Sequence, residues 1–153
     1  MDPTLRLDLE PLLNYFDKLL ARGRYDEGMR LLKTWLTKVE QARGKDSMEV
    51  AKLLDALGQG CKEQENFDDA KQYLSRSLSI KRRRLGSHHP EVATAIHRLA
   101  FCLDYTESAE RAKLLAEAHM IEKKAGKLNP FDQLVLNSDQ LKQAAEFSKP
   151  DQA

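Results

Sequence analysis

A chain of 153 residues offers enough sequence for one domain, and such a domain buries roughly two-thirds of the surface that its unfolded chain exposes. Charged residues make up 32%, but 25 Lys and Arg nearly balance 24 Asp and Glu, so the net charge of +1 gives no overall attraction to nucleic acid or to an anionic membrane. The sequence has no long apolar run and no signal sequence at its start, so we expect neither a membrane span nor secretion. The two cysteines match no pairing motif, and a cytoplasmic location, or else a nuclear one, is the simplest expectation.

Residues 8–47 are predicted to form a first pair of helices. Asp8 is a suitable N-cap for the first helix, and the second is expected over about 25–41. Phe16 and Trp35 stand where small residues are expected, which is typical of a terminal repeat that has a neighbour on one side only. For Trp35 we favour packing in the core over exposure to a partner.

Residues 48–89 show the most regular pair, with helices predicted over 48–65 and 67–85 and a turn at Asn66. The second of these helices ends in the basic run Lys81-Arg82-Arg83-Arg84. Cations in the last turn suit the negative end of the helix dipole, which we favour over a nuclear-import or nucleic-acid-binding motif.

A third pair is predicted to begin at Pro90, since proline suits the first position of a helix, and Gly86 can take the left-handed conformation that closes the preceding helix. The internal turn of this pair is expected at 106–108. The repeat pattern then stops, as expected for a helix that caps the last repeat. We expect a single domain over 1–148, with repeats at about 8–47, 48–89 and 90–128, a capping tail at 129–148 and a frayed end at 149–153.

The helix pairs repeat with a period of 42 residues. Pairs in this register include Val50 and Val92, Leu57 and Leu99, Gly58 and Ala100, Ala70 and Ala112, and Leu78 and Met120. Small side chains such as Gly58 and Ala70 allow two helix backbones to approach closely. This pattern resembles the tetratricopeptide repeat, whose usual length is 34 residues. The longer period and the phrase LGxxHPEVAxxxxxLA, over Leu85–Ala100, resemble the variant found in the kinesin light chain family.

The resemblance implies an all-α, right-handed superhelix of about three tetratricopeptide-like helix pairs, closed by the capping helix. It also implies that the first helix of each pair lines a concave groove. In the third repeat the groove positions are Thr94, His97, Arg98, Phe101, Asp104 and Tyr105. In the second they are Lys52, Asp55, Gln59, Lys62 and Glu63, and in the first Glu10, Leu13, Asn14, Asp17 and Leu20.

His97, Phe101 and Tyr105 are spaced four apart and should form one stripe on a helix face. Together with the mixed charges of the other positions, such a stripe could hold an extended or helical peptide. An alternative of equal weight is that these aromatic residues form the bed on which the tail packs.

Catalytic signatures are absent from the sequence, so we expect no enzyme and no cofactor. A metal site at His88-His89 with His97 or Cys102 is disfavoured, because the spacing lacks the usual ligand pattern and the family has a His-Pro turn here. A clamp for a C-terminal carboxylate is not expected either, since Arg98 alone matches the family's pattern.

The sequence therefore predicts a non-catalytic protein-protein interaction module, an adaptor or scaffold, that binds a protein or peptide segment in the concave groove. The alternative is a structural subunit that self-associates as a homo-oligomer, through the Phe16 and Trp35 face of the first repeat or through the tail. Nucleic acid and membranes are not expected as partners.

Overall fold

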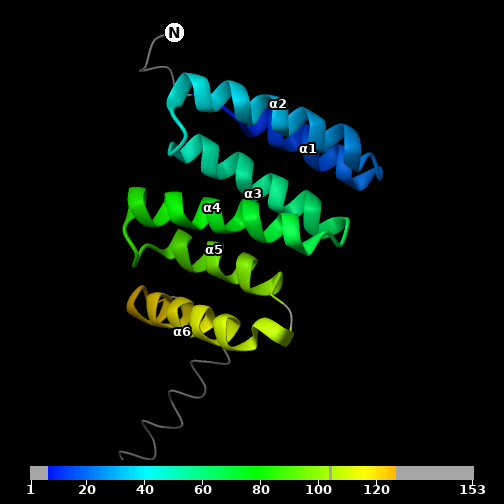
Figure 1. Ribbon diagram of the computed structural model, residues 1–153. Helices are drawn as coiled ribbons and strands as arrows, with labels where there is room; N and C mark the ends of the chain where they lie inside the picture. The colour runs from blue at the N-terminus through cyan, green and yellow to red at the C-terminus, as the bar shows by residue number, and fades with distance from the viewer. Residues whose placement is uncertain (1–6, 104, 127–153) are drawn as a thin grey trace, which may run out of the picture.

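The computed structural model describes residues 7–103 and 105–126, and within these ranges the chain is helical with no strand. The elements are α1 (Glu10–Ala21), α2 (Tyr25–Arg43), α3 (Met48–Glu63), α4 (Phe67–Leu85), α5 (Pro90–Phe101), the 3-10 turn η1 (Tyr105–Glu107) and α6 (Ser108–Lys124). Each α-helix packs on the next in chain order, so that three helix pairs stack side by side (Figure 1). The predicted all-α repeat fold is confirmed, whereas the superhelical hand and the single-domain boundaries stay predictions. The capping tail at 129–148 and the end at 149–153 lie outside the described residues.

Local side-chain hydrogen bonds explain where most of these helices begin. The backbone N–H of Glu10 donates to Asp8 Oδ1 at 3.0 Å, although Leu9 is the residue in the N-cap position. Asn66 accepts from the third residue of α4, and Nδ1 of His89 accepts from a backbone N–H in the first turn of α5. These acceptors satisfy donors that a first turn leaves without partners. The predicted bounds agree with the structure to within two residues at the ends of α2 and α3.

Gly86 follows α4 with φ of 88° and ψ of 149°. The positive φ was expected, but ψ is extended and therefore lies outside the compact left-handed helical region. Gly44 occupies the same place after α2, with φ of 87°. A side chain at either position would be strained, because L-residues rarely adopt such φ values.

The predicted close approach of helices occurs at Gly58. A β-carbon built there would lie 2.6 Å from Cγ of Leu74, so α3 and α4 touch at a point where only hydrogen fits. In the first pair Gly28 serves Phe16 in the same way, with a distance of 2.9 Å to Cδ2 of the ring.

This packing corrects one interpretation of the first repeat. The alternative hypothesis required Phe16 to lie on a surface that self-associates. Phe16 is fully buried and therefore is not part of such a surface. Trp35 is half-buried and packs against the core, with Nζ of Lys38 at 5.4 Å from its ring centroid. The predicted core packing of Trp35 is confirmed in part.

The 42-residue register fails in α6. Ala112 and Met120 were predicted to match buried residues of α4, yet both are exposed. Leu114 and Ala118 are buried instead, 40 residues after Leu74 and Leu78 (114 − 74 and 118 − 78). The repeat is therefore shortened by two residues before α6, because α5 already ends at residue 101.

Candidate interaction groove

A groove of about 530 Å³ crosses all three helix pairs. It is lined by Glu10, Leu13 and Asp17 of α1, Lys52, Asp55, Ala56 and Gln59 of α3, Lys81 of α4, and Glu91, Thr94 and Arg98 of α5. The first helix of each pair therefore contributes, as the family resemblance implied. Of the predicted groove residues, the structure brings together Lys52, Asp55, Gln59, Thr94 and Arg98 with Glu10, Leu13 and Asp17.

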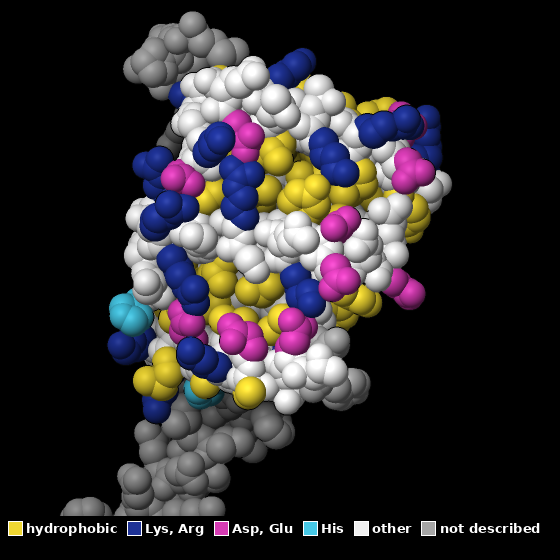
Figure 2. Space-filling view, in the orientation of Figure 1, with side chains coloured by type: hydrophobic (Ala, Val, Ile, Leu, Met, Phe, Trp, Pro, Cys, Tyr) yellow, Lys and Arg dark blue, Asp and Glu magenta, His cyan; other side chains and the backbone are white. Residues whose placement is uncertain are grey.

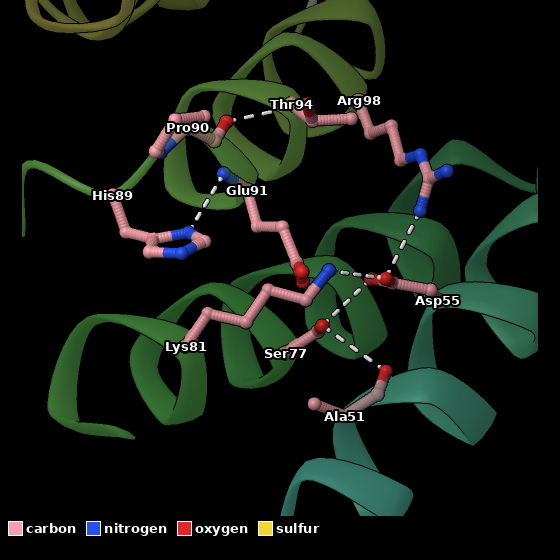
Figure 3. Close-up of polar contacts among 9 residues, drawn as sticks. All are labelled: Ala51, Asp55, Ser77, Lys81, His89, Pro90, Glu91, Thr94 and Arg98. Carbon is pink, nitrogen blue, oxygen red and sulfur yellow. Dashed lines mark hydrogen bonds and ion pairs between the residues drawn. The ribbon is translucent and has the colours of Figure 1, made fainter. Parts of the chain in front are cut away.

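The carboxylate of Asp55 organises one wall of this groove (Figure 3). Its Oδ2 lies 2.5 Å from Nζ of Lys81 and 3.0 Å from Nη1 of Arg98, and its Oδ1 accepts a hydrogen bond of 2.6 Å from Ser77 Oγ. The side chains of Asp55 and Lys81 retain 12% and 6% of their exposure, but Arg98 retains 49%. One carboxylate thus joins α3, α4 and α5, and the half-exposed guanidinium of Arg98 faces the solvent in the groove.

Sequence reasoning missed Lys81, Glu91 and Ala56 as groove residues. A signal for Lys81 existed, because it falls on the buried stripe of α4, where a lysine requires an acidic partner. Glu91 adds a further carboxylate to the lining, from the first turn of α5 (Figure 3). The groove consequently carries both acidic and basic side chains.

His97 and Phe101, two residues of the predicted aromatic stripe, do not line this groove. Nε2 of His97 pairs with Oε1 of Glu122 on α6 at 2.9 Å, so this side chain ties α5 to the last helix. Phe101 is 61% exposed and lies beside Phe67, with ring centroids 6.5 Å apart, and Nζ of Lys62 is 4.9 Å from its centroid. Asp104 and the side chain of Tyr105 lie outside the described residues.

The basic run at the end of α4 holds neighbouring repeats together. Nη2 of Arg82 reaches the carboxylate of Glu117 on α6 at 2.7 Å. Arg83 and Arg84 reach back to Asp46, through its carboxylate at 3.0 Å and its carbonyl at 2.7 Å. Figure 2 shows the same balance over one whole face, where basic and acidic side chains are interspersed. The four cations therefore bind oxygen atoms of this chain, which argues against a nucleic-acid site.

His89, Cys61 and Cys102 occupy positions that the packing and capping of the helices explain. His89 accepts a helix N–H, as the predicted His-Pro turn requires, and the described residues contain no group of three side chains that could hold a metal. Cys61 and Cys102 are free and buried, and burial raises the pKa of both thiols. In the described part of the chain no helix is long and apolar enough to cross a membrane.

Residues 19–83, which run from the last turn of α1 into the last turn of α4, match the family model of the tetratricopeptide repeat. Over these residues the chain is similar to tetratricopeptide repeat proteins. Its fold is similar to that of a putative kinesin light chain with nearly identical tetratricopeptide-like repeats from Podosopora anserina, at a TM-score of 0.67 and 18% identity, over 76% of this chain and 56% of the other. A variant of that protein matches at a TM-score of 0.67 and 16% identity, over 78% of this chain and 59% of the other.

The fold is thus similar to that of the tetratricopeptide-like repeats in those two structures, as the longer period predicted. The chain spans less than two-thirds of the length of those two structures. A third structure, BtubC (BKLC) from P. vanneervenii, aligns at a TM-score of 0.47 and 18% identity over 98% of this chain and 71% of the other. No curated protein matches the sequence.

Proposed function

We propose that this chain is a non-catalytic interaction module that binds a segment of a partner protein in the groove between α1, α3 and α5. The observation that carries the proposal is the groove itself. Its walls come from the first helix of all three pairs and carry charged side chains. The buried ion pair between Asp55 and Lys81 lies at the base of these walls. A tetratricopeptide array with such a groove is suited to hold an extended or helical segment.

The walls indicate the chemistry of that segment. Glu10 and Asp17 place carboxylates along α1, whereas Lys52 and Arg98 place cations on α3 and α5. Leu13, between Glu10 and Asp17 on α1, adds an apolar side chain to the lining. A segment that fits carries cationic side chains and an apolar residue along the edge that faces α1 and acidic side chains along the other edge, because complementary charges fix the register of binding.

A random peptide library displayed on phage tests this proposal. Thr94 lies in the groove and is exposed, so Thr94→Trp fills the groove without a change in the core. Ser75→Trp is the matched control, because Ser75 is exposed on α4 and lines none of the pockets described here. We expect peptides enriched on the wild type to lose binding to Thr94→Trp and to keep it with Ser75→Trp, as measured by fluorescence polarisation. Equal binding to both variants, or no enrichment at all, would contradict the proposal.

A further inference from the structure

Beyond the groove, a second pocket of about 370 Å³ opens beside the ends of α3 and α5. It is lined by Glu65, Asn66, Phe67, Asp68, Lys71, Phe101, Cys102 and Leu103. Phe67 and Phe101 retain 39% and 61% of their exposure. Single exposed apolar residues are ordinary, but two exposed rings in contact at one pocket indicate an interaction site.

The charges at this pocket favour a cation. Glu65 and Asp68 bring two carboxylates to the rim, and the side chain of Asp68 is 89% exposed. The cation of the lining, Lys71, is already engaged by Glu107 at 3.1 Å and by Asp68 at 3.3 Å. Those hydrogen bonds, chiefly the one to Glu107, raise the pKa of Lys71. The described residues of the lining thus carry one more negative than positive charge, and the ammonium of Lys62 lies beside the ring of Phe101.

The aromatic rings add to the same preference. Nζ of Lys62 lies 4.9 Å from the centroid of Phe101, so this ring already contacts a cation of the chain, which an arginine stacked there would displace. The ring of Phe67 is tilted by 56° to that of Phe101 and stands next to the acidic rim. A planar guanidinium can stack on such a ring while its N–H groups reach carboxylates, which an ammonium or an aliphatic side chain cannot do as well.

We propose that the pocket formed by Phe67, Phe101, Glu65 and Asp68 binds an arginine side chain of the partner segment held in the groove. The inference rests on the proposed function in so far as the groove and this pocket bind the same segment. Phe101 follows Thr94 by seven residues on α5, which corresponds to about 10 Å along the helix. An extended peptide covers that length with about three residues. The arginine should therefore lie about three residues along the bound segment from the residue that faces Thr94.

The probe for the pocket alone is N-acetyl-arginine amide, followed by NMR through the resonances of Phe67 and Phe101. We expect saturable shifts at both residues, and smaller ones with the neutral citrulline and norleucine analogues. Phe67→Ala should weaken binding about two- to fivefold, the size of one exposed cation–π contact. Glu65→Gln with Asp68→Asn tests the rim without truncating a ring, and should weaken binding most at low salt. Citrulline binding as tightly as arginine, tighter binding of norleucine, or an absence of saturable shifts would overturn the inference.

Two variants separate this inference from the proposed function. Thr94→Trp should leave binding of N-acetyl-arginine amide unchanged while it removes binding of the selected peptides. Replacing the arginine of a selected peptide by citrulline and replacing Phe67 of this chain by alanine should have coupled effects on binding. Once one of the two changes is made, the other should cost less binding free energy. Additive effects would show that the pocket does not read the same segment, even where the groove binds it.

Discussion

Replacement of Asp55 by alanine should destabilise the fold more than any loss of a surface charge. The substitution removes the carboxylate between α3, α4 and α5, and leaves Lys81 with 6% of its exposure and without the partner at 2.5 Å. Ser77 loses its acceptor at 2.6 Å but retains the carbonyl of Ala51 at 3.1 Å. The main cost is therefore the buried ammonium of Lys81.

The magnitude follows from the burial of each partner. Breaking a buried ion pair by removing one member costs about 3–5 kcal/mol, because the other charge stays out of water without compensation. Arg98 is 49% exposed, so its share of the cluster is worth at most about 1 kcal/mol. Asp55→Ala should thus lower the free energy of unfolding by about 3–5 kcal/mol, and Arg98→Ala by less than about 1 kcal/mol.

Urea unfolding followed by circular dichroism measures both changes, provided that the slope of free energy against urea is the same for each variant. A double variant, Asp55→Leu with Lys81→Met, provides the control. It replaces the pair by apolar groups and should recover most of the stability that Asp55→Ala loses. A cost of Asp55→Ala below about 1 kcal/mol, or no recovery in the double variant, would refute the assignment of a buried charge to Lys81.

Two further predictions concern the core. Gly58→Ala should be less stable than Gly60→Ala by about 1 kcal/mol in the same urea assay. The new methyl group at Gly58 meets the branched centre of Leu74 at 2.6 Å, whereas at Gly60 it meets the flexible sulfur of Met29 at 2.6 Å and the edge of the Phe16 ring at 3.0 Å; equal stabilities would contradict this. At pH 8, Cys61 and Cys102 should react with a disulfide reagent far more slowly in the folded protein than in urea. Burial hides the thiols and raises their pKa, so that less thiolate is present; rapid labelling of the folded protein would show that these helices open.

The sequence predicted the helices well because their signals are local. The apolar period places each helix, and Asn66 and His89 cap α4 and α5 through bonds that span three residues or fewer. The repeat period then predicted how these helices pair and which helices line most of the groove. The register of α6 was wrong because counting residues does not show where a repeat loses two of them. The structure places that loss before α6.

The side chains that contact other helices were harder to predict. The pair between Asp55 and Lys81 joins residues 26 apart, and His97 reaches Glu122 only because α6 presents that carboxylate to α5. Neither contact follows from the pattern within one helix. Phe101 likewise lies on the expected helix, but its ring contacts Phe67 of the neighbouring α4 instead of the groove. The type of each element could therefore be predicted from the sequence, whereas side-chain partners on other helices required the packing itself.

The Asp55 cluster also gives the groove one rigid part and one adjustable part. Lys81 and Ser77 hold the carboxylate in place from below, and neither is accessible enough to turn toward a partner. Arg98 is half exposed and can move its guanidinium toward an acidic group of a bound segment, since the first two residues keep Asp55 compensated. Binding can consequently use the charge of Arg98 without exposing the core to the cost of an isolated buried charge. The buried pair stabilises the packing of α3 against α4, and we expect the half-exposed Arg98 to be the cation that contacts a bound segment.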